Sequence, residues 1–596
     1  MTAVKAPTLA HAFELSASRY RSRVFLKERR AGAWLAHSWD DIGGAVRRLR
    51  AGLASLPIQR GERVAILAEN CPQWVITDLA VLGLGAVVVP LYPTSSAEET
   101  HHVLHDSGCC AVAVRGEEYL RKIAALCPTL PAIKTIIAMD EGTLKAQVQR
   151  PPGVTVKSME ELSGAGEAAA GQGAREEIAT IIYTSGTTGA SKGVMLSHGN
   201  ILSNCEAALD ALDLNDGDEI LSFLPIAHSF ERTAGYYTVM VGGGTIAYAE
   251  GLGQIAQNLL QINPTVVLTV PRLLEVIHDR ILRTVQKSSP ARRRIFAAAM
   301  ATGKRAAAYR YRGRPVPPYL ALPMAGFRRL VLNRISSVFG TRLRYLISGG
   351  APLPREIFEF FSAAEVPLVE GYGLTEAAPV VAVNLLGQTR PGTVGRALRG
   401  ITVKLSAEDE LLVHGPNVMQ GYYHLPQETR ETIDEAGWLH TGDIAAIDAD
   451  GYIAIKDRKK EIIVLSNGKN VSPAALEAKL TQDSLIAQAC VIGDRRKHPA
   501  ALLVPNFEAL ADVIKQRGLA GRQPSELVAE PAIRELFQQR IRQLNRQLGD
   551  YEALGAFALV AQAFTQERGE LTPTLKLRRR EIARHYRQEI EDLYGG

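Results

Sequence analysis

Cysteine is scarce in this chain, and long hydrophobic runs are missing from it. Six cysteines are scattered along the sequence and none forms a C-x-x-C pair, which excludes a disulfide scaffold and disfavours a zinc or thioredoxin-like site. No apolar stretch reaches the eighteen residues of a membrane span, and Met1–Ala10 lacks a basic start followed by an apolar run. We therefore expect no transmembrane helix, no signal peptide and a reducing, cytoplasmic compartment.

Acidic residues are absent from one long segment. Residues 280–355 contain seventeen lysines and arginines and no aspartate or glutamate, although the whole chain carries a net charge of only +6. Apolar stretches at Ile295–Met300 and Leu320–Phe327 lie inside this segment. The combination predicts peripheral contact with anionic lipid at the inner membrane surface. A solvated basic surface that attracts anionic ligands is the alternative. We expect no nucleic-acid partner, and the sequence does not fix the oligomeric state.

The overall composition is ordinary, with 46% hydrophobic and 22% charged residues, and a chain of 596 residues predicts at least two domains. Short apolar runs rich in β-formers alternate with helical stretches, which predicts an α/β class with mainly parallel sheets. The runs expected to form buried strands are Arg63–Glu69, Val87–Leu91, Ile178–Tyr183, Thr245–Ala249, Val266–Val270, Leu343–Ile347 and Val366–Glu370.

The sequence changes in character towards its C-terminal end. Gly400–Lys456 contains short strands and turns, which indicate a small β-barrel-like part, and helices with a few strands follow from Pro473. A charged helix is expected at Arg578–Tyr594. The predicted divisions are a large N-terminal domain at 1–457, a boundary at 458–460 and a smaller α+β lid domain at 461–596.

A loop rich in hydroxyls and glycine follows one predicted strand. It reads YTSGTTGASKG, residues 183–193. Its glycines let backbone N–H groups approach an anion, and Lys192 adds a charge that matches a polyphosphate. The P-loop pattern is absent, because Ser191 precedes Lys192 and Gly193 follows it. We therefore predict a phosphate loop outside the P-loop NTPases; a plain turn is the alternative. The loop contains Thr184, Ser185, Gly186, Thr187, Thr188 and Gly189.

Two further clusters follow predicted strands. Ser348–Pro354 reads SGGAPLP, a rigid turn with an open backbone face, and Gly371–Glu376 reads GYGLTE. Tyr372 lies between glycines and can stack on a purine. Thr375 can donate to a phosphate oxygen, and Glu376 is a hard oxygen ligand for Mg²⁺. Taken singly, these residues also fit a core aromatic and a carboxylate at a helix start.

Three more motifs combine polar groups with turns. LPIAHSFER contains His228, WLHTGD ends at Asp443, and LTPTLK ends at Lys576. A carboxylate that accepts two hydrogen bonds suits a ribose diol, and a prolyl turn presents a lysine ahead of a helix. Alone, His228 also fits a histidine at a helix start, and Lys576 also fits a surface lysine. The charged run Asp457–Glu461, at the predicted boundary, also fits a solvated linker.

With these motifs in this order, the sequence resembles the adenylate-forming superfamily, which includes acyl-CoA synthetases, luciferases and nonribosomal peptide adenylation domains. Its signature is close to Y-T-S-G-T-T-G-x-P-K-G, and Ser191 stands here where proline is usual. The form LPxxHxFER, the stretch PTVVLTVPRLLE at Pro264–Glu275 and the basic insertion after it are typical of the long-chain fatty acyl-CoA synthetase branch. The resemblance covers Ala12–Tyr586.

The resemblance implies an ATP-dependent ligase that activates a fatty acid as acyl-AMP, releases pyrophosphate and transfers the acyl group to coenzyme A, with Mg²⁺ as cofactor. A fatty acyl-AMP ligase that loads a carrier protein shares every motif and stays open. A non-catalytic nucleotide-binding homologue would lack Lys576 or Glu376, and this chain has both.

The resemblance also implies residue roles. The implied catalytic residues are Lys576, His228, Glu376 and Thr187, of which Thr187 and Glu376 would hold the metal. The implied nucleotide-binding residues are Thr184, Ser185, Gly186, Thr187, Thr188, Gly189, Lys192, Gly349, Gly350, Ala351, Tyr372, Gly373, Thr375, Asp443 and Arg458. Lys460 would be the hinge, and Gly468 would lie on the coenzyme A side.

Overall fold

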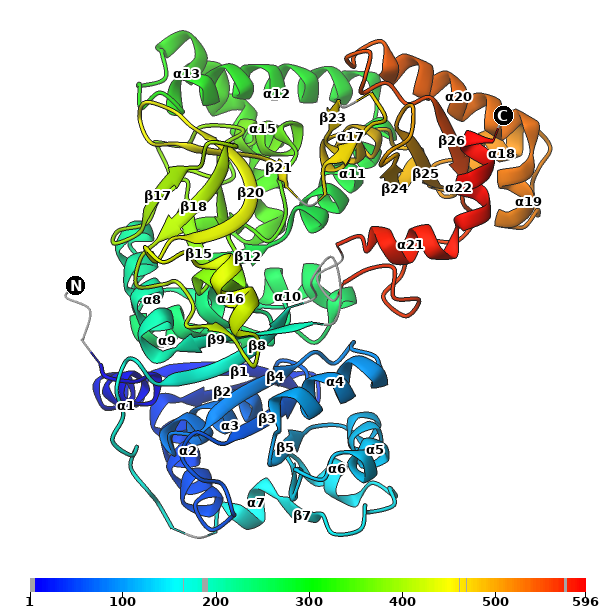
Figure 1. Ribbon diagram of the computed structural model, residues 1–596. Helices are drawn as coiled ribbons and strands as arrows, with labels where there is room; N and C mark the ends of the chain where they lie inside the picture. The colour runs from blue at the N-terminus through cyan, green and yellow to red at the C-terminus, as the bar shows by residue number, and fades with distance from the viewer. Residues whose placement is uncertain are drawn as a thin grey trace. The chain divides into compact units, whose positions relative to one another are not determined.

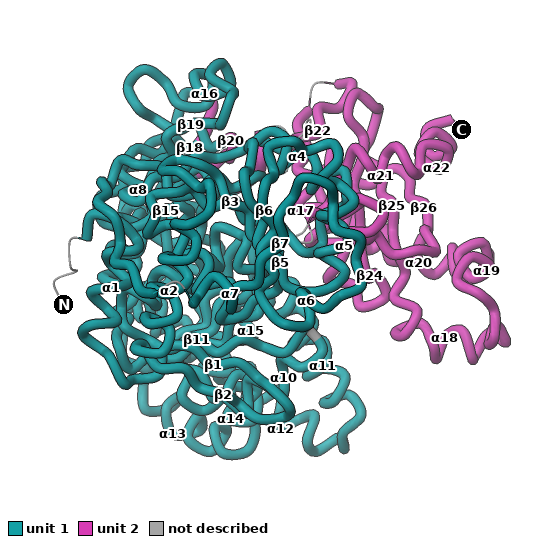
Figure 2. The backbone as a smooth tube through the Cα atoms, turned by 90° about the horizontal axis from the view of Figure 1, so that it is seen from below, with its two compact units in different colours: residues 1–407, 411–441, 446–455 teal, residues 408–410, 442–445, 456–596 magenta. Residues whose placement is uncertain are grey.

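The computed structural model describes residues 6–164, 166–184, 191–459, 461–467, 469–572 and 576–595. It separates into two compact units, coloured differently in Figure 2. The main division follows residue 455, close to the boundary predicted at 458–460. The larger unit comprises 1–407, 411–441 and 446–455, and the smaller unit comprises 408–410, 442–445 and 456–596.

An eight-stranded sheet, with strand order β19-β9-β8-β4-β3-β5-β6-β7, forms one part of the larger unit. The pairs from β8 to β7 are parallel, and β9 and β19 are added antiparallel at one edge. Its central strands are buried throughout, as expected for parallel strands covered by helices on both faces. The strands are β3 (Arg63–Leu67), β4 (Val87–Leu91), β5 (Ala111–Val114), β6 (Thr135–Ala138), β7 (Thr155–Ser158), β8 (Ile178–Thr184), β9 (Lys192–Ser197) and β19 (Gly421–Tyr422).

A nine-stranded sheet, with strand order β16-β15-β14-β13-β12-β10-β11-β1-β2, forms the second part (Figure 1). Its central strands are parallel, and the strands at both edges are antiparallel. The strands are β1 (Val24–Arg30), β2 (Ala33–Ser38), β10 (Glu219–Ser222), β11 (Thr245–Tyr248), β12 (Val266–Thr269), β13 (Tyr345–Ser348), β14 (Leu368–Gly373), β15 (Val380–Val383) and β16 (Arg396–Ala397).

Helices pack on these sheets and begin at identifiable caps. Ser197 ends β9, and its hydroxyl accepts a hydrogen bond from the backbone N–H of Asn200, while the backbone N–H of Ser197 donates to Oδ1 of Asn200, so α8 starts with a capping box. The helices of the larger unit are α1 (Leu9–Tyr20), α2 (Trp39–Leu53), α3 (Pro72–Gly83), α4 (Ala97–Ser107), α5 (Glu117–Leu126), α6 (Glu141–Lys145), α7 (Met159–Leu162), α8 (His198–Leu212), α9 (Thr238–Gly242), α10 (Ile255–Ile262), α11 (Pro271–Gln286), α12 (Pro290–Arg310), α13 (Pro318–Phe327), α14 (Asn333–Ser336), α15 (Arg355–Ala363) and α16 (Pro426–Thr432).

The predicted α/β class with mainly parallel sheets is confirmed, and the predicted strands lie within three residues of the observed ones. The region predicted as a small β-barrel-like part contains a four-stranded sheet of order β17-β18-β20-β21. All six cysteines are free thiols. Within the described ranges, no helix has both the length and the apolar character needed to span a bilayer. These strands are β17 (Thr402–Leu405), β18 (Glu410–His414), β20 (Leu439–Ile447) and β21 (Ile453–Arg458).

The smaller unit has its own apolar core between a three-stranded sheet, β24-β25-β26, and its helices. The prediction of a single helix at Arg578–Tyr594 is wrong. The segment forms two helices that meet at Tyr586. The Tyr586 side chain is buried against the ring of Phe564, 5.9 Å between centroids, and its backbone leaves the helical region. The elements are β22 (Ile463–Val464), β23 (Asn470–Val471), α17 (Pro473–Leu480), β24 (Ile486–Ile492), β25 (Ala500–Pro505), α18 (Ala511–Gln516), α19 (Pro524–Ala529), α20 (Pro531–Asn545), β26 (Ala556–Leu559), α21 (Arg579–His585) and α22 (Arg587–Tyr594).

Candidate active site

The predicted phosphate loop connects the two strands of a β-hairpin. β8 and β9 are antiparallel, with Thr184 paired to Lys192 and Tyr183 paired to Gly193. Lys192 therefore has a fixed backbone position at the base of the loop. At the same end, the imidazole of His102 on α4 lies 2.9 Å from the backbone oxygen of Ser191. The predicted phosphate-binding residues Ser185, Gly186, Thr187, Thr188 and Gly189 lie outside the described residues.

Tyr422 links two residues that were predicted from separate motifs. The ammonium of Lys192 lies 5.1 Å from the centroid of the Tyr422 ring, a cation–π contact that contributes about 0.5–2 kcal/mol. The Tyr422 hydroxyl donates a hydrogen bond of 3.0 Å to Oε1 of Glu376. Strand β19 positions the ring by pairing Tyr422 with Val194 of β9. A cation and a carboxylate are thus held near each other by one aromatic side chain, which the sequence did not single out.

The two glycine-rich turns leave the nine-stranded sheet at the same edge. Strands β12, β13 and β14 are parallel, and their last paired positions align Thr269 with Ser348 and Ser348 with Glu370. The turn after β13 is anchored to β12, because the backbone N–H of Gly349 donates a hydrogen bond of 3.1 Å to the backbone oxygen of Thr269. Oε1 of Glu370 accepts from the backbone of Leu353 at 3.0 Å, and burial raises the pKa of Glu370 to about 7.

Close contacts explain why glycine is needed in these turns. A Cβ atom on Gly349 would lie 2.9 Å from the ring of Phe230, and one on Gly373 would lie 2.0 Å from the backbone oxygen of Pro379. Gly350 adopts a φ of +81°, which favours glycine. The predicted site residues Gly349, Gly350 and Gly373 therefore have structural reasons for being glycine, and Ala351 follows them in the same turn.

The segment that contains His228 packs against both turns. The hydroxyls of Ser229 and Thr375 are 2.9 Å apart and buried, and Phe230 lies against Gly349. The backbone N–H of Phe230 donates to Nδ1 of His228 at 3.2 Å, which leaves Nε2 to carry the proton of the neutral ring. The structure thus brings the predicted residues His228, Thr375 and Gly349 into one neighbourhood, next to Glu376 and Tyr372.

A buried charge network anchors the residues after His228. Arg232 and Asp78 are almost completely buried and form an ion pair of 2.5 Å. Tyr236 and Tyr237 also donate to Asp78, and Arg232 donates to the hydroxyl of Thr180 on β8. Removing one partner of such a pair costs roughly 3–5 kcal/mol. The network therefore fixes the His228 segment to α3 and to the strand that leads into the phosphate loop.

Within the smaller unit, the predicted ribose-binding residues form an ion pair. Nε of Arg458, the last residue of β21, lies 3.0 Å from Oδ1 of Asp443, whose side chain is 5% exposed. The adjacent Lys459 pairs with Glu408 at 2.6 Å. The predicted hinge residue Lys460 and the predicted coenzyme A residue Gly468 lie outside the described residues.

Lys576 closes a turn in the same unit. Its backbone oxygen accepts from the N–H of Thr572 at 2.8 Å, and its N–H donates to the Thr572 hydroxyl at 3.0 Å. Three residues later, Arg579 at the start of α21 pairs with Glu461 at 2.7 Å and with Glu477 at 2.5 Å. Burial raises the pKa of Glu477 to about 7. This network, also unrecognised in the sequence, ties the segment that follows Lys576 to Glu461, just after the predicted hinge, and to Glu477 on α17.

The donor set around Glu376 fits Mg²⁺ bound together with phosphates. Across the described residues no group of three or more histidine, cysteine, aspartate or glutamate side chains could hold a metal ion. Mg²⁺ in phosphoryl chemistry commonly takes one or two protein oxygens and completes its shell with phosphate and water. A single carboxylate oriented by the Tyr422 hydroxyl, with a hydroxyl-rich loop following β8, satisfies that requirement.

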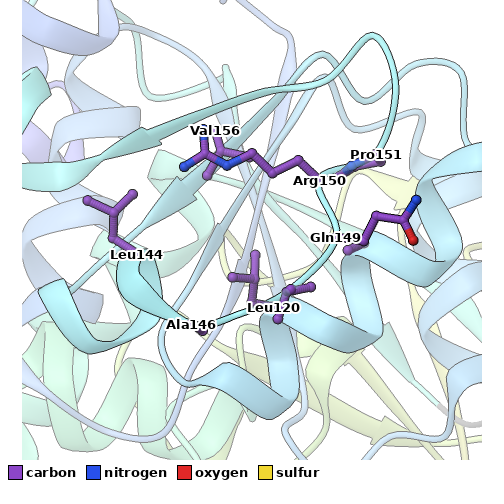
Figure 3. A pocket seen from close by; sticks show the side chains of 9 residues that line it. Leu120, Leu144, Ala146, Gln149, Arg150, Pro151 and Val156 are labelled. Carbon is purple, nitrogen blue, oxygen red and sulfur yellow. The ribbon is translucent and has the colours of Figure 1, made fainter.

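A pocket elsewhere on the larger unit does not contain these residues (Figure 3). It lies beside α5 and α6 and is lined mainly by apolar side chains such as Leu120, Leu144 and Val156, together with Arg150. Its volume of about 10 Å³ has room for about one water molecule. It is too small for a nucleotide, and it lies by β7, at the opposite edge of the sheet from β9 and β19.

The hydroxyl-rich hairpin loop, the glycine turns and the lysine turn occur in a chain that two family models match over most of its length. The family model for AMP-binding enzymes matches residues 13–423, and the model for the C-terminal domain of AMP-binding enzymes matches residues 460–596. The chain belongs to the AMP-binding enzyme family, which confirms the predicted superfamily.

Relatives extend over nearly the whole chain. Long-chain-fatty-acid–CoA ligase FadD15 of Mycobacterium bovis is 33% identical over 579 residues, 95% of this chain and 93% of that protein. Peroxisomal long chain acyl-CoA synthetase 7 of Arabidopsis thaliana is 30% identical over 94% of this chain and 82% of its own length. Among solved structures, the adenylation domain of a carboxylate reductase from Mycobacterium chelonae has a TM-score of 0.79 at 24% identity, covering 100% of this chain and 92% of that one.

The buried carboxyl of Glu231 makes stability depend on pH. Its Oε1 lies 2.5 Å from the Ser222 hydroxyl, and burial raises its pKa from 4.5 to about 8. The folded state therefore holds a proton that the unfolded state releases, so this contribution is present at acid pH and is lost as pH rises through 8. Glu231→Gln avoids the loss. We expect the Tm of E231Q, relative to the unmodified protein, to increase between pH 6 and pH 9 by calorimetry.

An exposed carboxylate provides the control for this measurement. Glu435→Gln changes a glutamate on the surface of the same unit, and its Tm difference should be the same at both pH values. A constant Tm difference for E231Q across this range would show that Glu231 is not held protonated in the folded protein.

Proposed function

We propose that this chain is an AMP-forming long-chain fatty acid–CoA ligase. It activates a fatty acid with ATP, releases pyrophosphate and transfers the acyl group to coenzyme A. The observation that carries the proposal is the convergence of Lys192, Tyr422 and Glu376 beside Thr375 and the His228 segment. It is supported by near full-length similarity to proteins named long-chain-fatty-acid–CoA ligases.

In the first step, a carboxylate oxygen of the fatty acid attacks the α-phosphorus of ATP. The bond from that phosphorus to the bridging oxygen breaks, and pyrophosphate leaves with the electron pair. Lys192, with the loop hydroxyls Thr187 and Thr188, would hold the leaving pyrophosphate, and Thr375 would bind the α-phosphate. Lys576 would reduce the repulsion between the two anions, so the protein acts mainly through positioning and charge.

Other predicted residues would orient the nucleotide. Tyr372 would stack on the adenine, with Gly349, Gly350 and Ala351 along its edge, and Asp443 with Arg458 would bind the ribose. Mg²⁺ held by Glu376 and Thr187 supplies charge neutralisation at the phosphates when it is bound.

In the second step, the thiolate of coenzyme A, formed when the thiol releases its proton to solvent, attacks the acyl carbon of the acyl-AMP. The bond from that carbon to the phosphate oxygen breaks, and AMP leaves with the electron pair as the thioester forms. His228, with its Nε2 proton, would lie on the thiol side of the acyl group. Rotation at Lys460 would withdraw Lys576 and bring Gly468 towards the thiol, a conformational step with its own rate. We place the enzyme in the cytoplasm, with peripheral membrane contact through residues 280–355.

A product assay tests the proposal and its alternative. Pyrophosphate release should depend on a fatty acid across a series of increasing chain length, and acyl-CoA should accumulate only with coenzyme A. If the acyl group passes to a phosphopantetheinylated carrier protein instead, the chain is a fatty acyl-AMP ligase. Release of phosphate in place of pyrophosphate would contradict both.

Lys576 is expected to act in only one half-reaction. Lys576→Ala should lower acyl-AMP formation by at least about a hundredfold, because a charge that offsets two anions is lost. Transfer from supplied acyl-AMP to coenzyme A should change little. Lys515→Ala, at an exposed lysine of α18 in the same unit, is the control. Equal loss in both half-reactions would show that Lys576 has another role.

The Tyr422 hydroxyl is expected to support metal and nucleotide binding. Tyr422→Phe keeps the ring under Lys192 and removes the hydroxyl that donates the 3.0 Å hydrogen bond to Glu376. Such a bond to a charged group contributes about 1.5–3 kcal/mol, so the Mg²⁺ concentration for half-maximal activity should rise about tenfold. Tyr423→Phe, whose ring stacks on His424, should leave it unchanged. An unchanged Mg²⁺ requirement in Y422F would remove Tyr422 from the site.

A further inference from the structure

Exposed large hydrophobic side chains are concentrated in one part of the larger unit. Five of the eleven among the described residues lie between residues 276 and 330. This stretch largely coincides with the segment 280–355, which has seventeen cationic and no acidic side chains. Apolar and cationic surface thus occur together here. The five are Val276, Ile295, Tyr319, Leu322 and Leu330.

Helix α13 is the most apolar element of this segment. Its sequence, PYLALPMAGF, contains no charged residue, yet only Leu320 and Met324 are buried. Met324 packs in a small cluster with Ala299 and Ala306 of α12. The opposite side is uncovered, with Leu322 75% and Tyr319 66% exposed. Figure 1 shows α13 at the upper edge of the larger unit, next to α12.

Arginines lie immediately before and after this helix. Arg312 and Arg314 precede it and Arg329 follows it, and all three are exposed. Among the described residues no carboxylate pairs with any of these three. Arg328 differs, since it forms a 2.5 Å ion pair with Glu365. An apolar helix is therefore flanked by three arginines that form no ion pair with the carboxylates the structure describes.

This combination matches an anionic lipid interface. An exposed leucine side chain gains free energy when it leaves water for an apolar phase, and a tyrosine, with an apolar ring and a polar hydroxyl, suits the boundary between lipid and water. Tyr319 is near the start of α13, and its hydroxyl lies 3.0 Å from the hydroxyl of Tyr309, near the end of α12. Each arginine near an anionic membrane surface adds electrostatic attraction to the lipid head groups. An acidic protein would match the arginines but would not require a helix without charged side chains.

We propose that α13 and its flanking arginines dock the protein on anionic lipid bilayers. Tyr319 and Leu322 enter the acyl region, and Arg312, Arg314 and Arg329 contact the phosphate head groups. The inference rests on the proposed function in one respect: a long-chain fatty acid partitions into the same bilayer, so docking places the enzyme where its substrate accumulates.

Co-sedimentation of the full chain with vesicles tests the docking surface. Binding should be strong to phosphatidylcholine mixed with phosphatidylglycerol, weak to phosphatidylcholine alone, and reduced by salt. Leu322→Glu should weaken binding to the anionic vesicles at least about tenfold, and the pair R312E and R314E should do the same. Leu260→Glu, at a leucine of α10 that is 64% exposed, should bind as the unmodified protein does.

Three outcomes would overturn the proposal. The first is equal binding to both vesicle types, and the second is an equal loss of vesicle binding in L322E and L260E. The third is concentration-dependent self-association of the protein without vesicles that L322E abolishes. The activity of L322E towards a fatty acid below its micellar concentration should stay unchanged. If the unmodified protein is inactive in that assay, the result counts against the proposed function. If the same protein still binds anionic vesicles, the docking proposal stands although the proposed function fails.

Discussion

The candidate site depends on one side chain, Tyr422, that contacts a cation with its ring and a carboxylate with its hydroxyl. Lys192 begins β9 of one sheet and Glu376 follows β14 of the other, and their direct pairing would cancel the charges that a metal-bound polyphosphate requires. The aromatic ring offers Lys192 a weak attraction, and the phenol gives Glu376 one hydrogen bond. Both charged groups are thereby positioned while each keeps much of its capacity for a ligand.

Buried polar groups fix structural elements within each of the two units. The Asp78–Arg232 pair joins the residues after His228 to α3, and Thr180 extends that network to the strand that enters the phosphate loop. In the smaller unit, Arg579 ties the segment that follows Lys576 to Glu461 and Glu477. Each unit thus has an internal ionic anchor close to the residues proposed for chemistry, which limits how far those residues can drift.

The sequence predicted the parallel strands well, because buried strands such as Val87–Leu91 are short continuous apolar runs. It also predicted which turns carry polar groups, since glycine and hydroxyl residues mark them. It missed Tyr422, which lies in no motif and reaches the site only through the antiparallel pairing of β19 with β9. The Asp78–Arg232 pair was equally hidden, because its partners are 154 positions apart. The break at Tyr586 depends on packing against Phe564, which helical periodicity does not encode.

Isotope exchange between pyrophosphate and ATP tests the central claim most directly, because it reports reversible attack on the α-phosphorus. The account predicts exchange that requires a long-chain fatty acid and Mg²⁺, proceeds without coenzyme A, and falls to background in Lys576→Ala. Exchange that needs no carboxylic acid, or its absence while ATP is cleaved to ADP, would contradict it.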